Sequence, residues 1–105
     1  MVQDIGPVLT HRVEIVQQVL AGKTLTQICR TTHHSASAVA NYLSTFIRCA
    51  QLARQGVHPT QIAFLLRRGR TLVERYLQLA RAAEQDPNQA DHLGALLEVG
   101  WHEKK

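Results

Sequence analysis

Two stretches of this chain read G-K-T-L-T-Q-I-C-R-T-T-H-H-S-A-S-A-V-A-N-Y-L (Gly22–Leu43) and G-V-H-P-T-Q-I-A-F-L-L-R-R-G-R-T-L-V-E-R-Y-L (Gly56–Leu77). They are offset by 34 residues without a gap, and seven positions are identical. A match at a fixed period is the signature of a repeated supersecondary unit. Because this period is about the length of one helix-turn-helix, the match predicts two such units in tandem.

Composition supports a helical fold. Ala, Leu, Gln and Arg are abundant, and the prolines are only Pro7, Pro59 and Pro87. No segment alternates apolar and polar residues with the two-residue period of a strand. The length of 105 residues is typical of one small domain. We therefore expect an all-α fold in which two three-helix units share a long central helix and a short C-terminal helix follows.

Apolar periodicity and capping residues set the expected boundaries. Helices are predicted at about 11–21, 25–31, 36–55, 59–67, 70–85 and 88–99. Thr24 and Gln27 have the spacing of a capping box, and Ser35, Gly69 and Asp86 stand at N-cap positions of later helices. The predicted division is an N-terminal arm (1–9), a first unit (10–55), a second unit (46–85) that shares 46–55, and a C-terminal helix and tail (86–105).

The charge of the chain is unevenly distributed. The formal net charge is +4, but residues 11–85 carry ten Lys or Arg and three Glu, a net charge of +7. The part from Asp86 onward is mildly acidic. A basic body of this kind indicates a polyanionic partner, most often nucleic acid, although charge that only maintains solubility is the alternative.

Several other classes of protein are disfavoured. The longest apolar run, 62–66, is far shorter than the roughly 20 residues of a membrane span, and the start of the chain lacks the pattern of a signal peptide. Cys29 and Cys49 form no disulfide framework, so we expect reduced thiols and a cytoplasmic location. Cys29, His33 and His34 lack the second Cys/His pair of a zinc site. No phosphate-binding glycine loop, nucleophile elbow or carboxylate pair occurs, so we expect no enzyme activity, cofactor or metal.

The repeated positions match the internal requirements of a helix-turn-helix. Its first helix needs a small residue where the second helix crosses it. Its second helix needs a β-branched residue at the crossing and an apolar residue three positions later. The apolar residue is a tyrosine in both units, and both tyrosines are predicted to anchor the core. The set is Cys29, Val39 and Tyr42 in the first unit, and Ala63, Val73 and Tyr76 in the second. A helical bundle without a ligand has no reason to keep this set twice at one spacing, so DNA binding is favoured over a scaffold.

The second unit is the predicted main DNA reader. In a helix-turn-helix, the N-terminal residues of the second helix point at base edges in the major groove. Arginine can bind guanine and glutamine can bind adenine, while residues of the turn lie beside phosphate. The predicted DNA-binding residues of this unit are Arg67, Arg68, Arg70, Thr71, Arg75 and Gln78. Alternatively, the arginines form a solvated basic face in which Arg70 pairs with Glu74, four positions later.

The first unit carries a nearly uncharged equivalent of this face. Its predicted DNA-binding residues are His33, His34, Ser35, Ser37 and Asn41. Asn41 can read adenine and a histidine can contact phosphate, but small neutral residues also suit a protein–protein surface. We therefore expect the first unit to be either a helper in DNA binding or an interaction surface.

A family resemblance covers about residues 11–80. The segment T-T-H-H-S-A-S-A-V-A-N-Y-L-S-T-F-I-R-C, which starts at Thr31, resembles a bacterial and archaeal family known only as a domain of unknown function. The matching residues are His33-His34-Ser35, Val39, Tyr42, Phe46 and Arg48, followed by Gly56, Ile62-Ala63 and Leu72-Val73-Glu74-Arg75-Tyr76-Leu77. The resemblance implies a tandem helix-turn-helix fold and brings no established activity. Members typically carry an acidic residue at the position of Arg75, so DNA reading there is expected to be particular to this chain.

Together these features predict a sequence-specific double-stranded DNA-binding protein, a small regulator of transcription or of a mobile element, that reads the major groove mainly with helix 70–85. Two alternatives stay open. One is a protein–protein adapter that uses the helix-turn-helix units without binding DNA. The other is the detached DNA-recognition head of a transposase or recombinase, because the second unit is also similar to such heads. A homodimer or a protein partner is predicted to bind through Leu93, Leu97 and Trp101.

Overall fold

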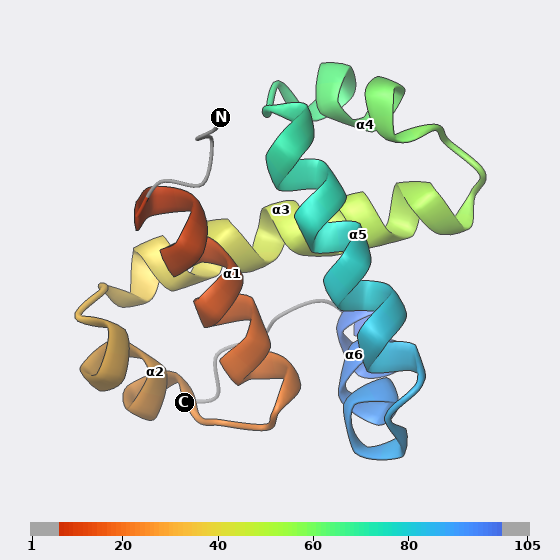
Figure 1. The fold of residues 1–105 in the computed structure, drawn as a ribbon. Coiled ribbons are helices and arrows are strands. Elements are labelled where there is room, and N and C mark those ends of the chain that lie inside the picture. Colours follow the sequence, from red (N-terminus) through yellow and green to blue (C-terminus); the bar gives the residue numbers. More distant parts are fainter. Residues whose placement is uncertain (1–6, 100–105) are drawn as a thin grey trace.

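The structure, a computed structural model, describes residues 7–99, with the side chains of residues 11–98. Six α-helices and no strand occur in this range, so the all-α prediction is confirmed there (Figure 1). The helices are α1 (Pro7–Leu20), α2 (Leu25–Thr32), α3 (Ala36–Arg54), α4 (Pro59–Leu66), α5 (Arg70–Glu84) and α6 (Pro87–Val99). The radius of gyration of the Cα atoms is 13.2 Å, close to the value of about 13 Å for a compact domain of 100 residues.

Helix α3 is the centre of the fold. It contacts each of the other five helices, and in Figure 1 it runs across the molecule between them. Within residues 7–99, α2 contacts α1 and α3 alone, and α4 contacts α3 and α5 alone. Each short helix is therefore held between two longer helices, and α3 is common to both groups. The buried residues of α3 are Val39, Leu43, Phe46, Ile47, Cys49 and Ala50.

The backbone conformation repeats with the sequence. Gly22 and Gly56 have φ angles of +90° and +89°, and His33 and Arg67 have φ angles of 59° and 56°. Helices α2 and α4 are both eight residues long. Each is followed by a three-residue connection to the next helix. The 34-residue offset is thus present in helix length and turn conformation as well as in residue type.

Local capping accounts for the start of two helices. The Thr24 hydroxyl accepts a hydrogen bond from the Gln27 N–H at 3.2 Å, and Gln27 Oε1 accepts one from the Thr24 N–H at 2.9 Å. This reciprocal pair is the predicted capping box of α2. At the start of α6, Asp86 Oδ1 accepts from the Asn88 N–H at 3.0 Å. Both caps pair N–H groups that the first helical turn otherwise leaves without a partner.

Seven helix boundaries differ from the predictions: the starts of α1 and α6, and the ends of α1 to α5, which each differ by one residue. Helix α1 begins at Pro7, inside the predicted arm 1–9, because proline has no N–H to leave unpaired in the first turn. Helix α4 ends at Leu66 and not at Arg67, because Arg67 adopts the left-handed conformation. Helix α6 begins at Pro87, one residue early, for the same reason as α1. Residues 1–6 of the predicted arm lie outside the described residues.

The two repeated tyrosines have different surroundings. Tyr76 is fully buried, and its ring packs edge-on against Phe46 with the centroids 5.6 Å apart. Burial raises the pKa of the Tyr76 hydroxyl to about 12, which the positive charge of Arg12 opposes only in part. Tyr42, predicted as an equivalent core anchor, is only half-buried. Tyr42 packs at the margin of the core, and the Arg12 guanidinium lies over its ring, 4.5 Å from the centroid.

Helix α6 folds back on the preceding helices. It contacts α1, α3 and α5. Leu93 is 1% exposed, and Gln51 Nε2 donates a hydrogen bond to the backbone oxygen of Leu97 at 3.0 Å. Leu93 and Leu97 thus pack against the core of their own chain, and a partner reaches Leu93 only if α6 moves. Trp101, the third residue predicted at a partner surface, lies outside the described residues.

The two glycines with positive φ angles give a matched test of the repeat. Either substitution by alanine forces a left-handed L-residue, which we expect to cost about 1–2 kcal/mol of unfolding free energy. At Gly22 the added Cβ also lies 2.9 Å from His92 Cε1, whereas at Gly56 no atom lies within 4 Å. Moving the His92 ring strains the hydrogen bond from its Nδ1 to the Leu20 carbonyl, which is 2.8 Å long.

We therefore expect Gly22→Ala to lower the unfolding free energy by more than Gly56→Ala does, by about 1 kcal/mol, the typical net value of one hydrogen bond. Urea unfolding of both variants measures the difference. A Gly22→Ala protein as stable as Gly56→Ala would contradict the contact between α6 and the α1–α2 turn.

Candidate nucleic-acid interface

The connection between α4 and α5 presents two arginines to solvent. Arg67 ends α4 in the left-handed conformation, with φ 56°. The Arg68 N–H donates to the Ala63 carbonyl at 3.0 Å, which closes the end of the helix. Both arginine side chains are exposed. Among the described residues neither forms an ion pair, so their charges are available to an anion.

The N-terminus of α5 lacks a side-chain cap. Its N-cap residue is Gly69, which makes no side-chain hydrogen bond. At the equivalent place in the first repeat, the Ser35 hydroxyl accepts a hydrogen bond from the Ala38 N–H at 3.2 Å. The backbone N–H groups of the first turn of α5 therefore have no side-chain acceptor, and such a helix end attracts anions. Arg67, Arg68 and Arg70 surround this end.

The exposed face of α5 carries most of the other predicted contacts. Arg70, Thr71 and Gln78 are exposed. Arg70 Nε pairs with Glu74 Oε2 at 2.8 Å, as the alternative interpretation of the sequence predicted. Both side chains are about half-exposed, so the pair is screened by water and can open at little cost.

Arg75 lies at the edge of this face. Its side chain is half-buried, and Nε is buried without a hydrogen-bond partner among the described residues. Arg75 is therefore less accessible than the other predicted contacts of α5. An unpaired buried N–H is unfavourable, so a bound ligand that accepted a hydrogen bond from Arg75 Nε would remove this cost.

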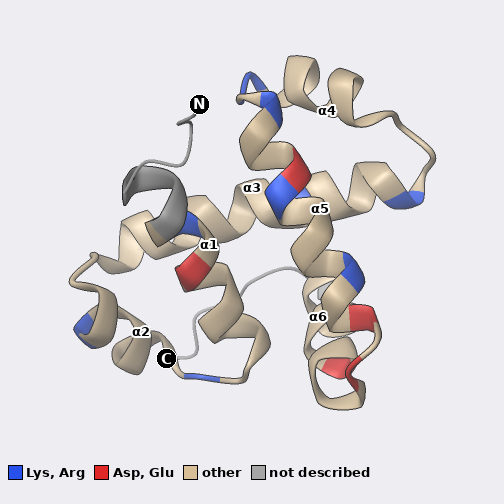
Figure 2. Cartoon of the chain, viewed as in Figure 1, with Lys and Arg blue, Asp and Glu red and all other residues tan. Residues whose placement is uncertain are grey.

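Basic and acidic residues separate along the molecule. Of the charged residues, Figure 2 shows only basic ones at the α4–α5 connection, whereas acidic residues gather where α5 meets α6, next to Arg54 and Arg81. The acidic residues there include Glu84, Asp86 and Asp91. Arg54, at the end of α3, is paired with Glu84 at 3.5 Å. The α4–α5 connection is thus the part of the described surface where unpaired positive charge is concentrated.

The first repeat offers a neutral surface at the equivalent positions. Ser37, Asn41 and Ser44 are exposed along one side of α3, and the first charged residue on that side is Arg48. His33 and Ser35 are exposed as well. Figure 1 shows the α2–α3 connection at the left end of α3 and the α4–α5 connection at the top of the molecule. The structure therefore does not bring the two predicted sets of DNA contacts into one patch.

His34 makes two edge-to-face contacts with aromatic rings. Its ring lies between those of His11 and Tyr42, with centroid distances of 5.4 Å and 5.7 Å. Its Nδ1 lies 2.8 Å from the Thr32 carbonyl oxygen, and because a carbonyl only accepts, Nδ1 carries the proton. His34 thus ties the α2–α3 connection to α1, and only its Nε2 is left for another partner. No spacing in the sequence indicates these contacts, because His11 comes from a separate helix.

The core contains a buried cysteine whose pKa is raised. Cys49 on α3 is buried, and burial raises the pKa of its thiol to about 11. The positive charge of Arg68 opposes this rise in the pKa of Cys49. Cys29 is half-buried, and both thiols are free.

Two kinds of feature are absent from the described part of the chain. Between residues 7 and 99, no group of three or more His, Cys, Asp or Glu side chains is placed to hold a metal ion. No helix within the same bounds combines the length and the apolar character that crossing a bilayer requires.

Comparison with known proteins gives one match. The model of a family described as "Protein of unknown function (DUF1670)" matches residues 1–79. This range ends inside α5 and includes the α4–α5 connection. No curated protein and no solved structure matches the chain significantly.

The buried thiol gives a pH-dependent prediction. In a Cys29→Ala protein, Cys49 is the single thiol, and with a pKa of about 11 it is almost wholly protonated at pH 8. Because the thiolate is the nucleophile, we expect alkylation by iodoacetamide at pH 8 to be roughly 100-fold slower than in urea, and to accelerate as pH rises towards 11. A Cys49→Ala protein, which keeps the half-buried Cys29, is the control. Equal rates in folded and unfolded protein would show that Cys49 is not buried in the core.

Proposed function

We propose that this chain, which belongs to the DUF1670 family, binds double-stranded DNA in a sequence-specific manner through α4 and α5. The observation that carries the proposal is the uncapped N-terminus of α5, which is surrounded by arginines of which Arg67 and Arg68 are exposed and unpaired. Backbone donors and guanidinium groups together suit a DNA phosphate. Exposed Arg70, Thr71 and Gln78 then follow along the same helix.

The helix-turn-helix interpretation supplies the geometry of binding. Helices α2 and α4 have equal lengths, equal turn conformations and equal spacing to α3 and α5. We interpret α2–α3 and α4–α5 as two helix-turn-helix units. In such a unit the second helix enters the major groove and its N-terminal residues contact base edges. Helix α5 is then the reader, with Arg67 and Arg68 on the DNA backbone.

The two repeats divide this work unequally. The first repeat has His33 and His34 in place of the arginine pair, and the His34 ring contacts those of His11 and Tyr42 edge-to-face. Its exposed side of α3 is uncharged as far as Arg48. Since phosphate contacts supply most of the affinity of DNA-binding proteins, we assign the main contact to the second repeat. The role proposed for this chain is therefore that of a small regulator of transcription or of a mobile element.

Salt dependence tests the phosphate contacts. We expect the chain to bind genomic DNA fragments with an affinity that falls steeply between about 50 and 200 mM salt. An Arg67→Ala/Arg68→Ala protein should bind all sequences more weakly and lower the slope of log K against log salt by about 2. The matched control is Arg30→Ala/Arg48→Ala, which removes two exposed arginines elsewhere. No binding at low salt, or equal losses in the two double variants, would sink the proposal.

Base selection tests the reading helix. After selection of bound sequences from random DNA, Arg70→Ala should cost about 1–3 kcal/mol on the selected site and relax the preference at one base pair. Glu74→Gln frees Arg70 from its ion pair and changes stability by no more than about 0.5 kcal/mol, because the pair is exposed. That variant should keep the same preferred site. If Arg70→Ala retains the full preference, α5 is not the reader.

A further inference from the structure

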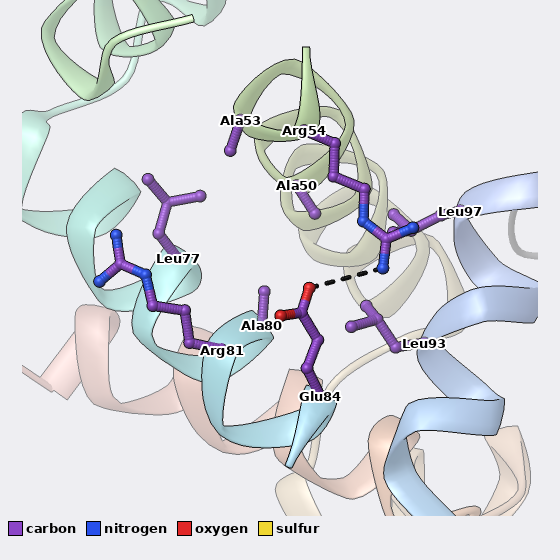
Figure 3. Close-up of a pocket in the computed structure, with 9 residues that line it drawn as sticks. All are labelled: Ala50, Ala53, Arg54, Leu77, Ala80, Arg81, Glu84, Leu93 and Leu97. Carbon is purple, nitrogen blue, oxygen red and sulfur yellow. Dashed lines mark hydrogen bonds and ion pairs between the residues drawn. The ribbon is translucent and has the colours of Figure 1, made fainter. Parts of the chain in front are cut away.

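A half-open hollow lies between α3, α5 and α6, away from the α4–α5 connection. Its volume is about 220 Å³. Figure 3 shows three alanines, Ala50, Ala53 and Ala80, around it, with leucines of α5 and α6 beside them. Arg54, Arg81 and Glu84 complete the lining. The hollow is therefore an unfilled space between three packed helices that is apolar at its alanines and leucines and charged at the other three residues.

The repeat explains why this space is empty. The positions of the three alanines lie 34 residues after Val16, Val19 and Phe46. In the first repeat these larger side chains are all buried and fill the corresponding part of the core. The greatest difference is at Ala80, where the second repeat lacks the phenyl ring that Phe46 supplies to the first. At the hollow the second repeat thus has alanine where the first repeat has an aromatic side chain.

The same chain exposes a phenyl ring elsewhere. On α4, Phe64 is 81% exposed and Leu65 is 58% exposed. The equivalent residues of the first repeat are Arg30 and Thr31. Because α2 forms the same helix with polar residues at these positions, the fold does not require Phe64 and Leu65 to be apolar. Their exposure therefore indicates contact with a partner.

We propose that Phe64 of one copy of this chain inserts into the Ala80 hollow of a second copy. A cavity of about 150 Å³ in a protein core holds a benzene molecule, so the hollow is large enough for one phenyl ring. The charged side chains at the rim are Arg54, Arg81 and Glu84, and Glu84 is already paired with Arg54 at 3.5 Å (Figure 3). The occupant is therefore selected by the size and apolar lining of the hollow and not by charge.

The proposed contact is heterologous, since it joins two different surfaces of the same chain. Such a contact leaves one free Phe64 and one free hollow at the ends of every dimer, so assembly continues head to tail unless a ring closes. One phenyl ring and one leucine give a much smaller interface than a stable dimer needs. We therefore infer a weak, concentration-dependent association that raises the local number of copies and does not form a permanent dimer.

Sedimentation equilibrium of the full chain without DNA tests this proposal separately from the proposed function. The monomer mass is 11.8 kDa. We expect the average mass to rise above that of a monomer as the concentration approaches about 1 mM, without a plateau at the dimer, as for a weak interface. A wild-type chain that stays monomeric at 1 mM overturns the proposal. The partner of the exposed Phe64 ring would then be a small molecule or another protein.

Two variants separate the ring from the hollow. Phe64→Gln removes the ring, and Ala53→Leu fills the hollow from its half-buried edge. We expect each protein alone to stay monomeric at concentrations at which the wild type associates. An equimolar mixture should form a complex of one copy each, because the intact hollow of one variant accepts the intact Phe64 of the other. A mixture that sediments as two monomers, or a Phe64→Gln chain that still associates, overturns the proposal.

A second variant that fills the hollow is needed in case Ala53→Leu does not fold. Ala80→Phe restores the residue that the first repeat has at Phe46, and thermal unfolding shows whether it and Ala53→Leu are folded. The control is Gln61→Ala, which shortens a polar side chain on the exposed face of α4 and should leave association unchanged within about twofold. If either folded filling variant associates like the wild type, the hollow is not the receptor.

Discussion

The rest of the structure depends on the burial of α3. No other helix in the described range contacts all of the remaining five, and its buried Phe46 meets Tyr76 of α5 edge-on with the ring centroids 5.6 Å apart. This contact joins the core of the first repeat to the core of the second. Because α2 and α4 are each held only between neighbouring long helices, neither has a stable position without α3. Short helices of eight residues are marginal alone and take their stability from such packing.

Sharing one helix between two repeats also explains where the repeats diverge. Positions that carry the turns and the crossings are kept, as at Gly22 and Gly56. Positions that face the other repeat have different neighbours, so Tyr76 is buried under Phe46 whereas Tyr42 is covered by Arg12. The solvent-facing positions are free to change, and the arginines of the α4–α5 connection replace uncharged residues there. A common scaffold thus supports two surfaces with different electrostatic character.

The two proposals place different partners on neighbouring parts of one element. Arg67 and Arg68 follow α4 at the end that meets α5, while Phe64 projects from the exposed face of α4. A weak head-to-tail contact beside a DNA contact has a physical advantage. Copies that are held near one another on the same DNA associate at a high effective concentration. An interface that is too weak to form dimers in free solution can then increase the fraction of DNA sites that carry the protein. Helix α4 would then connect DNA binding with self-association.

The sequence by itself determined the elements that local rules control. The capping box at Thr24, the glycine turns and the Arg70–Glu74 pair all act within four residues, so spacing alone predicted them. The exposure of Arg67 and Arg68 was expected from their place in the turn, and that of Gln78 from its place on the second helix. Only the tertiary structure decided the half-burial of Tyr42 and Arg75, the ring contacts of His34 and the hollow at Ala80. The physical reason is that burial is a sum over side chains from separate helices, here α1, α3, α5 and α6, whose relative positions no local pattern encodes.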